Sequence, residues 1–309
     1  MTSQSLSVVA VVTVYQPESA PALLAPLSQQ VDVIVVVDDG SGPEYSAVRD
    51  LIRVRGIEVI ELQCNSGIAV ALNTGIHRAR QLGADVVVTF DQDSTVDDGF
   101  VEALLEAQGR ARSLGIQAGP VVPEYFGAVS QAGREVAPGV TLAAHAIQSG
   151  MLLSAEVLDV VGGMDPDLFI DLVDTDFELR CADAGLPCIV ADGLRLPHRL
   201  GACYRLPRPW GKVLPVLMLS SPFRYYYRAR NRVIVNRRHR NHSSRLRAEG
   251  FADAVYFVLA ILLAHPRQAM LRLIREGRLA GRSGVGGRMP DDLSALASTI
   301  SWRAERVED

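Results

Sequence analysis

The chain has 309 residues, of which 48% are hydrophobic, and its formal net charge is −4. This length supports one large domain with an appendage, or two domains. The four cysteines form no C-x-x-C pair and the N-terminus lacks a basic signal-peptide start, so we do not expect a secreted, disulfide-stapled protein. We therefore expect a cytoplasmic protein whose cysteines are free, buried and inert.

The first 122 residues alternate between apolar, β-branched runs and segments with helical spacing. The runs that predict strands are Leu6–Tyr15, Val31–Val37, Ile57–Leu62, Asp85–Phe90 and Ile116–Val122. The segments that predict helices are Glu44–Arg55, Gly67–Leu82 and Asp97–Leu114. This alternation indicates an α/β fold, a mostly parallel sheet with helices on both faces. Ligands of such sheets bind beyond the carboxyl ends of the strands.

Polar and acidic residues follow three of the predicted strands. They are Thr13 and Tyr15 after the first, Asp38 and Asp39 after the second, and Asp91 and Asp93 after the fourth. Two carboxylates in a D-x-D can share a hard divalent cation that also binds substrate phosphate oxygens. The pair Asp38-Asp39 precedes Gly40, so it fits a turn as well as contacts to a nucleobase or ribose. We expect the binding site at this rim.

The segment Asn65–Gly75 has small residues at the start of a predicted helix. They would let a ligand approach the N-terminal amides and the positive end of the helix dipole. Tight packing of the helix on the sheet explains the same residues. The segment is not a G-x-G-x-x-G, which argues against a dehydrogenase.

From about Thr141 the pattern is less regular. The predicted elements there are a strand within Ile147–Ser154, a helix opened by Phe169–Arg180 and ended by Gly185, and a short strand at Cys188–Ala191.

Three acids, Asp171, Asp174 and Asp176, crowd the start of that helix. Interaction with the helix dipole and capping explain one or two of them, and one of the three is a candidate general base. His198 follows Pro197, and a lone histidine is more often structural than functional.

The charge is unevenly divided along the chain. Residues 1–203 carry 27 acids and 11 bases, residues 204–288 carry 3 acids and 18 bases, and the last 21 residues carry 5 acids and 2 bases. The change near residue 203 marks a boundary, and the basic part is expected to face an anionic surface or ligand. Nucleic acid is not expected, because no zinc-finger spacing, RNA-recognition signature or helix-turn-helix accompanies the charge. Lys212 is the only lysine, and we attribute the arginine excess mainly to a high-GC coding habit.

No run reaches the ~20 apolar residues of a membrane span. The nearest is Val255–Ala264, which is followed by the basic segment Met270–Arg275. An interfacial helix on an anionic membrane and a core helix beside a solvated basic neighbour explain this pattern equally well.

Taken together, the motifs resemble one family. TVY, VDDGS, N-x-G-x-A-x-A-x-N-x-G, FDQDS, QSGMLLS, FIDLVDTDFELR and PHRLG occur in this order, with Ser221–Asn231 after them. The set resembles family 2 glycosyltransferases of the GT-A fold, and within that family the bacterial rhamnosyltransferases, over roughly residues 8–240. The resemblance implies a Rossmann-like catalytic domain over residues 1–203. It also implies a basic, mainly helical region over residues 204–309 that faces the acceptor or membrane.

The implied activity is inverting transfer of a sugar, L-rhamnose from dTDP-β-L-rhamnose, in the synthesis of cell-surface polysaccharide. The acceptor would be a saccharide or a polyprenyl-diphosphate-linked glycan. The implied location is cytoplasmic and peripheral, at the inner face of the cell membrane, and a homo-oligomer is compatible with this.

The resemblance also assigns residues. Asp174 matches the catalytic base, while Asp91, Asp93 and His198 match ligands of Mg²⁺ or Mn²⁺. The implied nucleotide-sugar contacts are Thr13, Tyr15, Asp38, Asp39, Asn65, Gly67, Asn73, Asp91, Gln92, Ser149 and Gly150. The chain departs from the family at Val173, where an acid usually precedes the base, and at Asp176, where glutamate is common.

Three alternatives remain open. The first is a glycosyltransferase with a UDP-sugar donor. The second is a nucleotidyltransferase, although the Gly-rich loop with a lysine typical of that class is missing from the N-terminal half. The third is a non-catalytic nucleotide-sugar-binding or membrane scaffold protein, which would bind donor without releasing dTDP.

Overall fold

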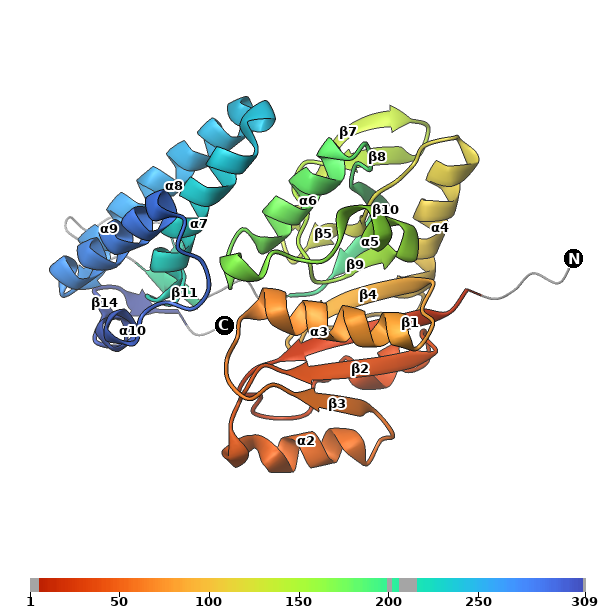
Figure 1. The fold of residues 1–309 in the computed structure, drawn as a ribbon, viewed down its shortest axis with the longest axis horizontal. Coiled ribbons are helices and arrows are strands. Elements are labelled where there is room, and N and C mark those ends of the chain that lie inside the picture. The colour runs from red at the N-terminus through yellow and green to blue at the C-terminus, as the bar shows by residue number, and fades with distance from the viewer. Residues whose placement is uncertain (1–5, 199–201, 206–215, 308–309) are drawn as a thin grey trace, which may run out of the picture. The chain divides into compact units, whose positions relative to one another are not determined.

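The computed structural model describes residues 6–198, 202–205 and 216–307. The chain divides into two compact units (Figure 1). The first comprises Met1–Asp165 and Val173–Arg199, and the second comprises Pro166–Leu172 and Leu200–Asp309. The last three residues of the PHRLG motif and Lys212 lie outside the described residues.

The first unit is built on one mixed sheet. Its strands are β1 (Val8–Val14), β2 (Val33–Asp38), β3 (Glu58–Glu61), β4 (Val86–Asp91), β5 (Val121–Phe126), β6 (Val129–Ser130), β7 (Ala132–Ala137), β8 (Val140–Ala143), β9 (Met151–Ser154) and β10 (Ile189–Leu196). Their order is β3-β2-β1-β4-β9-β5-β10-β8-β7, with β6 paired to β5. Strands β3, β2, β1 and β4 are parallel, as are β5 and β10, whereas β9 runs antiparallel to β4 and β5. The predicted α/β fold with a mostly parallel central sheet is confirmed.

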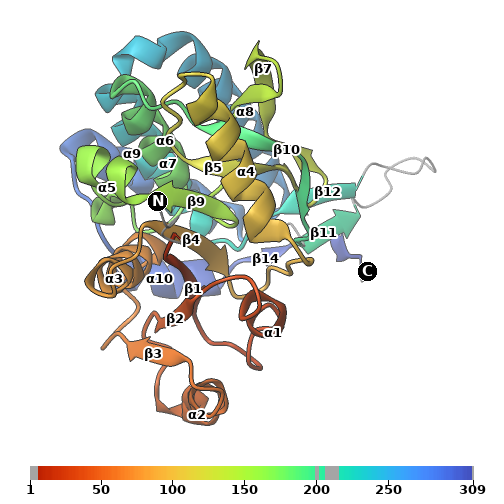
Figure 2. The same cartoon turned by 90° about the vertical axis from the view of Figure 1, so that its right-hand side faces the viewer.

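Helices cover both faces of this sheet. They are α1 (Leu24–Leu27), α2 (Ser46–Arg53), α3 (Ile68–Gln81), α4 (Phe100–Ser113), α5 (Ala155–Val161) and α6 (Val173–Asp183), with a 3₁₀ turn at Pro43–Tyr45. Figure 2 shows α3 and α5 on one side of the sheet and α1 and α4 on the other. Every residue of β1 is buried, because the strand lies between two helical layers and its sequence, VVAVVTV, has no charge to solvate.

The ends of three parallel strands lie level with one another. Thr13 of β1 pairs with Val37 of β2 and with Asp91 of β4, and Val14 pairs with Asp38. Polar residues that follow the strands separately in sequence therefore share one edge of the sheet. This is the rim that the strand endings predicted.

The predicted strand Ile116–Val122 was wrong over its first five residues, since β5 begins at Val121. The amide of Gly119 donates to the carbonyl of Pro187 at 2.8 Å. A Cβ on Gly119 would lie 2.0 Å from the carbonyl oxygen of Leu186. The segment before β5 therefore lies against the chain before β10 without forming a strand of its own.

The expectation that all four cysteines are buried was also wrong. Cys181 and Cys188 are buried, Cys203 is half-buried and Cys64 is exposed, and all four are free thiols. Cys64 follows β3, where the chain turns towards α3, so no layer covers it.

The second unit is mainly helical, as predicted for the basic C-terminal region. Its helices are α7 (Arg224–Arg238), α8 (Ser243–Leu263), α9 (Arg267–Ser283) and α10 (Asp291–Ser298), with 3₁₀ turns at Pro166–Leu168 and Arg240–His242. Its short strands are β11 (Ala202–Arg205), β12 (Val216–Leu219), β13 (Ala264–His265), β14 (Ser301–Trp302) and β15 (Glu305–Arg306). None of the helices among the described residues is long and apolar enough to cross a membrane.

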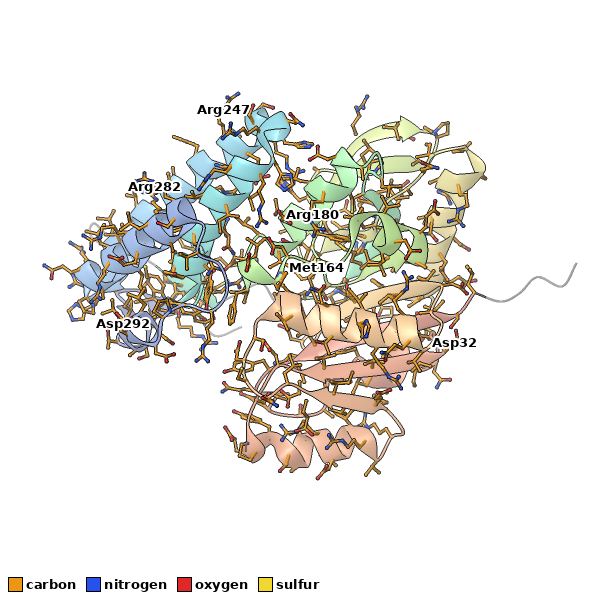
Figure 3. All side chains as sticks on the ribbon, viewed as in Figure 1. Asp32, Met164, Arg180, Arg247, Arg282 and Asp292 are labelled. Atoms are coloured by element: carbon orange, nitrogen blue, oxygen red, sulfur yellow. The ribbon has the colours of Figure 1, made fainter. Side chains whose placement is uncertain are left out.

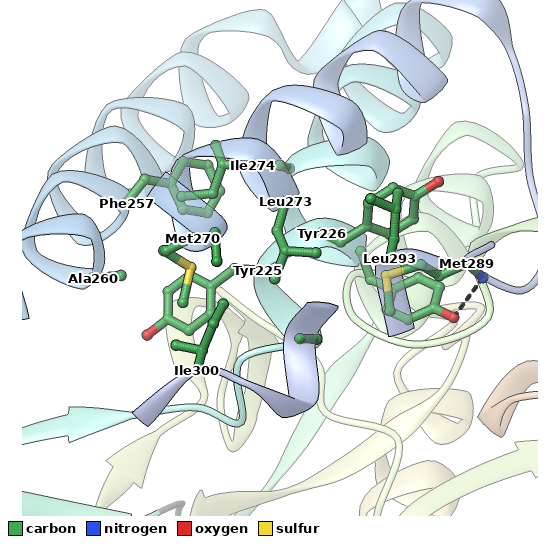
Figure 4. Packing of buried hydrophobic residues seen from close by; sticks show 14 of the residues in the cluster. Tyr225, Tyr226, Phe257, Ala260, Met270, Leu273, Ile274, Met289, Leu293 and Ile300 are labelled. Atoms are coloured by element: carbon green, nitrogen blue, oxygen red, sulfur yellow. Dashed lines mark hydrogen bonds between the residues drawn. The ribbon is translucent and has the colours of Figure 1, made fainter. Parts of the chain in front are cut away.

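One apolar cluster holds these helices together (Figure 4). Tyr225 and Tyr226 of α7 pack with Phe257 of α8 and Met270 of α9. Phe169, from the short segment before α6, belongs to the same cluster. Burial of this ring explains why a segment so close to the first unit in sequence is part of the second.

Candidate active site

The D-x-D lies at the end of β4 and is fixed by the QSG motif. The amide of Asp91 donates to Ser149 Oγ at 3.0 Å, and the Ser149 and Ser94 hydroxyl oxygens lie 2.7 Å apart. The side-chain amide of Gln148 donates to Asp91 Oδ1. Because Ser149 precedes β9, which pairs with β4, one strand orients the acids at the end of its neighbour.

Gln148 is a site residue that the sequence analysis missed. Its side chain is buried, and its Oε1 has no hydrogen-bond partner. The hydroxyl of Thr89 donates to the Gln148 carbonyl and so fixes the backbone there. A buried amide next to Asp91 can hold the carboxylate while offering an acceptor to a ligand. Its place directly before the predicted Ser149-Gly150 pair was the available signal.

The backbone conformation and the close neighbours at position 150 favour glycine. Its φ is +78°, and a Cβ there would lie 3.1 Å from both Leu196 and Phe100. Its amide donates to the Thr89 carbonyl at 2.7 Å. The close approach keeps the loop before β9 against the end of β4.

The second acid of the D-x-D faces the predicted histidine. Asp93 Oδ1 lies 3.5 Å from His198 Nδ1, and the His198 ring packs on Phe126 with the ring centres 4.3 Å apart. The Nδ1 atom is buried and has no hydrogen-bond partner. Burial lowers the pKa of His198, and the nearby Asp93 charge only partly opposes this. A lowered pKa favours the neutral imidazole, which can offer a lone pair.

The residues at this rim fit a hard divalent cation. Carboxylate oxygens are the usual ligands of Mg²⁺ and Mn²⁺, and a neutral imidazole suits transition ions. The observation that supports the fit is the orphaned Nδ1 of His198 facing Asp93. Within the described residues, no three His, Cys, Asp or Glu side chains are already gathered at metal-binding distances.

The predicted nucleoside contacts Asp38 and Asp39 already have protein partners. Asp38 Oδ1 accepts from the amide of Ser41 at 3.0 Å and from its hydroxyl, and Oδ2 accepts from Arg49 at 2.7 Å. This pairing closes the turn after β2, the turn role that the Asp-Gly sequence allowed.

Asp39 bridges to the start of α3. Its two oxygens accept from the amides of Ser66 and Gly67 at 2.7 and 2.9 Å. Burial raises the pKa of Asp39, and these two amide hydrogen bonds oppose the rise. The carboxylate thereby fixes the backbone on which Asn65 lies, and Asn65 Oδ1 is a buried acceptor without a hydrogen-bond partner.

Two further predicted contacts connect β1 to β4. The amide of Tyr15 donates to Gln92 Oε1 at 2.8 Å, and the Thr13 hydroxyl donates to the Phe90 carbonyl at 3.4 Å. Asn73 has a different set of partners, because its side-chain amide exchanges two hydrogen bonds of 2.8 Å with the backbone of Met164.

The three acids near α6 have different environments. Asp176 is fully buried and accepts from Arg180 at 2.9 Å. Arg180, which is labelled in Figure 3, also donates to the carbonyls of Val161 and Gly163. Asp174 lies in the first turn of α6, is half-buried, and accepts from the Thr175 amide at 2.8 Å. Asp176 therefore holds Arg180, which binds the backbone at the end of α5, while Asp174 is partly accessible at a helix N-terminus.

The sequence matches known glycosyltransferases. Residues 9–131 match the family described as Glycosyl transferase family 2. The chain is 32% identical to dTDP-rhamnosyl transferase RfbF of Shigella flexneri over 247 residues. The aligned region covers 75% of this chain and 80% of the relative. The chain belongs to glycosyltransferase family 2. The resemblance found from the motifs, including that to bacterial rhamnosyltransferases, is confirmed.

Solved glycosyltransferase structures share the fold. The S. aureus TarS 1–349 structure superposes with a TM-score of 0.54 at 13% identity, covering 94% of this chain and 83% of that one. Its complex with UDP-GlcNAc gives 0.51 at 16% identity, covering 90% and 92%. GalNAc-T7 with UDP, GalNAc and Mn²⁺ gives 0.53 at 14% identity, covering 62% of this chain and 44% of that one. At such identities the likeness establishes the GT-A fold alone.

Proposed function

We propose that this glycosyltransferase moves L-rhamnose from dTDP-β-L-rhamnose to a hydroxyl of a glycan or lipid-linked acceptor, with inversion. The donor is supported by the RfbF relative, which is named a dTDP-rhamnosyl transferase and matches over most of its length. The structural observation that carries the proposal is the D-x-D at the end of β4, braced by Gln148 and Ser149 at the carboxyl rim of parallel strands. That rim is where open α/β sheets bind ligands.

In the proposed mechanism Asp174 is the general base. It removes the proton from the acceptor hydroxyl while that oxygen attacks the anomeric carbon. The bond from this carbon to the diphosphate breaks, and dTDP leaves with the electron pair. General-base assistance of this kind contributes ~10²–10⁴-fold to the rate.

Asp91, Asp93 and His198 are the residues that would hold Mg²⁺ or Mn²⁺. When bound, such a cation neutralises the charge that develops on the diphosphate. The chain itself contributes the orientation of these groups. Gln148 holds the Asp91 carboxylate, and Phe126 limits the positions open to the His198 ring.

For the acceptor we propose a lipid-linked glycan at an anionic membrane face. Helix α8 turns four apolar side chains outward at helical spacing: Phe251, Val255, Val258 and Leu262. We call these residues the α8 stripe. Helix α9 exposes five arginines: Arg267, Arg272, Arg275, Arg278 and Arg282. Exposed apolar side chains beside cationic ones are typical of a helix at an anionic lipid surface.

A sedimentation assay tests the membrane part. The protein is expected to pellet with vesicles that contain anionic lipid, and to stay in solution with phosphatidylcholine vesicles or in high salt. Val255→Asp and Val258→Asp should weaken pelleting. If they change the oligomeric state in analytical ultracentrifugation and leave pelleting intact, the stripe is an interface between copies of the chain instead.

A thermal-shift panel tests the donor and the metal. A ligand that binds only the native state raises the melting temperature by mass action. We expect a rise with dTDP-β-L-rhamnose and Mn²⁺ together that is much smaller without Mn²⁺, in a panel that includes UDP-glucose, UDP-N-acetylglucosamine and GDP-mannose. A metal-dependent rise with a UDP sugar would discard rhamnose, and no rise with any donor would favour a scaffold protein.

A further inference from the structure

The segment Pro166–Leu172, which we call the base segment, has a conformation that its own sequence disfavours. Phe169, Asp171 and Leu172 have φ of +62°, +67° and +60°. These are left-handed values that glycine tolerates and that are costly for other residues. Leu172 is joined to Val173, the first residue of α6, so the chain passes from these residues directly into the turn that carries Asp174.

Asn231 of α7 supplies hydrogen bonds to the base segment. Its Nδ2 lies 2.8 Å from the carbonyl oxygens of Leu168 and Ile170 and 2.7 Å from that of Asp171. The residue is fully buried, and its Oδ1 accepts from Arg230 Nε at 2.9 Å. One side chain thus donates to three backbone carbonyls between the 3₁₀ turn Pro166–Leu168 and the start of α6.

Arg230 extends this contact. It is fully buried, and its Nη2 donates to the carbonyls of Asp167 and Leu168, both at 2.9 Å. Its Nη1 donates to the carbonyl of Gly287, whose amide donates to the Asp167 carbonyl at 2.7 Å. The guanidinium therefore ties the start of the base segment to the loop between α9 and α10.

Arg224 and Tyr227 hold the other side chains of the segment. Arg224 donates to both oxygens of Asp171, at 2.6 and 3.1 Å, in a forked pair. The ring of Phe169 stacks on that of Tyr227 at 4.7 Å, with 7° between the planes. Residues 224, 227 and 231 recur at helical spacing, so one face of α7 contacts the whole segment.

We propose that Arg224 and Asn231 are positioning residues that hold the base segment in its left-handed conformation and so fix the direction of Asp174. This inference rests on the proposed role of Asp174 as the base. Backbone conformations of this kind persist only where the surroundings over-determine them, and they concentrate at functional sites. The contacts from α7 supply these additional restraints on the backbone. A misplacement of about 1 Å at a reacting group can cost ~10²-fold in rate.

The test compares substitutions on one helix. Arg224→Gln and Asn231→Asp are expected to lower kcat for dTDP release by about 10–100-fold, with water as acceptor and Mn²⁺ present. The KM for dTDP-β-L-rhamnose and its Mn²⁺-dependent thermal shift should not change. Arg224→Lys should recover part of kcat. Arg237→Gln is the matched control, because Arg237 lies on α7 but donates to the carbonyl of Arg282.

Combining the variants separates positioning from general stability. In an Asp174→Asn background, Arg224→Gln should cause no further loss, since it acts through that carboxylate. A multiplied loss in the double variant, or wild-type kcat in a folded Arg224→Gln protein, would overturn the positioning role alone. Full activity of Asp174→Asn by itself would instead refute the base, and the positioning role with it.

Discussion

Two parts of the candidate site are held in place by different means. The donor rim, residues 89–94 with 148–150, is braced by neighbouring strands of one sheet. The base segment is held by side chains of α7, about 60 positions later in the sequence. The rim thus follows from strand pairing, while the base depends on a long-range contact. Damage to each should have a different signature.

The largest expected effect separates binding from chemistry. Asp174→Asn should lower dTDP release by ~10²–10⁴-fold, because the base is lost, and should leave the Mn²⁺-dependent thermal shift with dTDP-β-L-rhamnose intact. Asp93→Asn should instead abolish most of that shift. If both variants lose the shift equally, the division between a donor rim and a separate base is wrong.

The next effect concerns stability. Arg230→Ala should lower the free energy of unfolding by about 2–5 kcal/mol, because it removes a fully buried side chain together with its hydrogen bonds to the carbonyls of Asp167, Leu168 and Gly287. Arg282→Ala, at an exposed position of α9 (Figure 3), should change it by less than ~0.5 kcal/mol. Urea unfolding followed by circular dichroism measures both. Equal losses would mean that the buried contacts of α7 matter no more than surface charge.

A smaller effect tests the ion pair between Glu249 of α8 and Arg232 of α7. Burial would raise the pKa of Glu249, but hydrogen bonds from Arg245 and Arg232 outweigh it and the pKa is lowered. A carboxyl with a lowered folded pKa adds stability above its unfolded pKa, near 4.5, that is lost as the pH falls through the folded value. Glu249→Gln should therefore cost about 1 kcal/mol at pH 7 and progressively less in acid. A cost that is the same at pH 7 and pH 3 would contradict this.

The sequence predicted that the polar strand ends share one edge of the sheet, and the structure confirms this for a physical reason. Parallel strands align their carboxyl ends, so acids that follow separate strands must meet, as Thr13, Asp38 and Asp91 do. What it could not supply was the partners of each polar group. Nothing local shows that Asp38 pairs with Arg49 or that Gln148 holds Asp91.

The conformation of the base segment could not be predicted from the sequence, because it also depends on partners distant in the chain. Asp171 and Leu172 are left-handed, although neither is glycine. Charge counting treated the basic region as a whole when it predicted an anionic partner, and it did not distinguish individual arginines. Arg228 and Arg232 of α7 both donate to buried Asp253 at 2.6 Å, whereas the α9 arginines are exposed. Composition cannot separate an arginine that pairs with a buried acid from one whose side chain is exposed at the surface.

The most direct test of the central claim is the configuration of the first product. The enzyme would be given dTDP-β-L-rhamnose, Mn²⁺ and water as acceptor, and the rhamnose anomers followed by ¹H NMR from the earliest time points. Inverting displacement with Asp174 as base predicts that α-L-rhamnose is formed first and that the β anomer grows in only by mutarotation. If β-L-rhamnose is formed first, the reaction retains configuration and the proposed single displacement is contradicted.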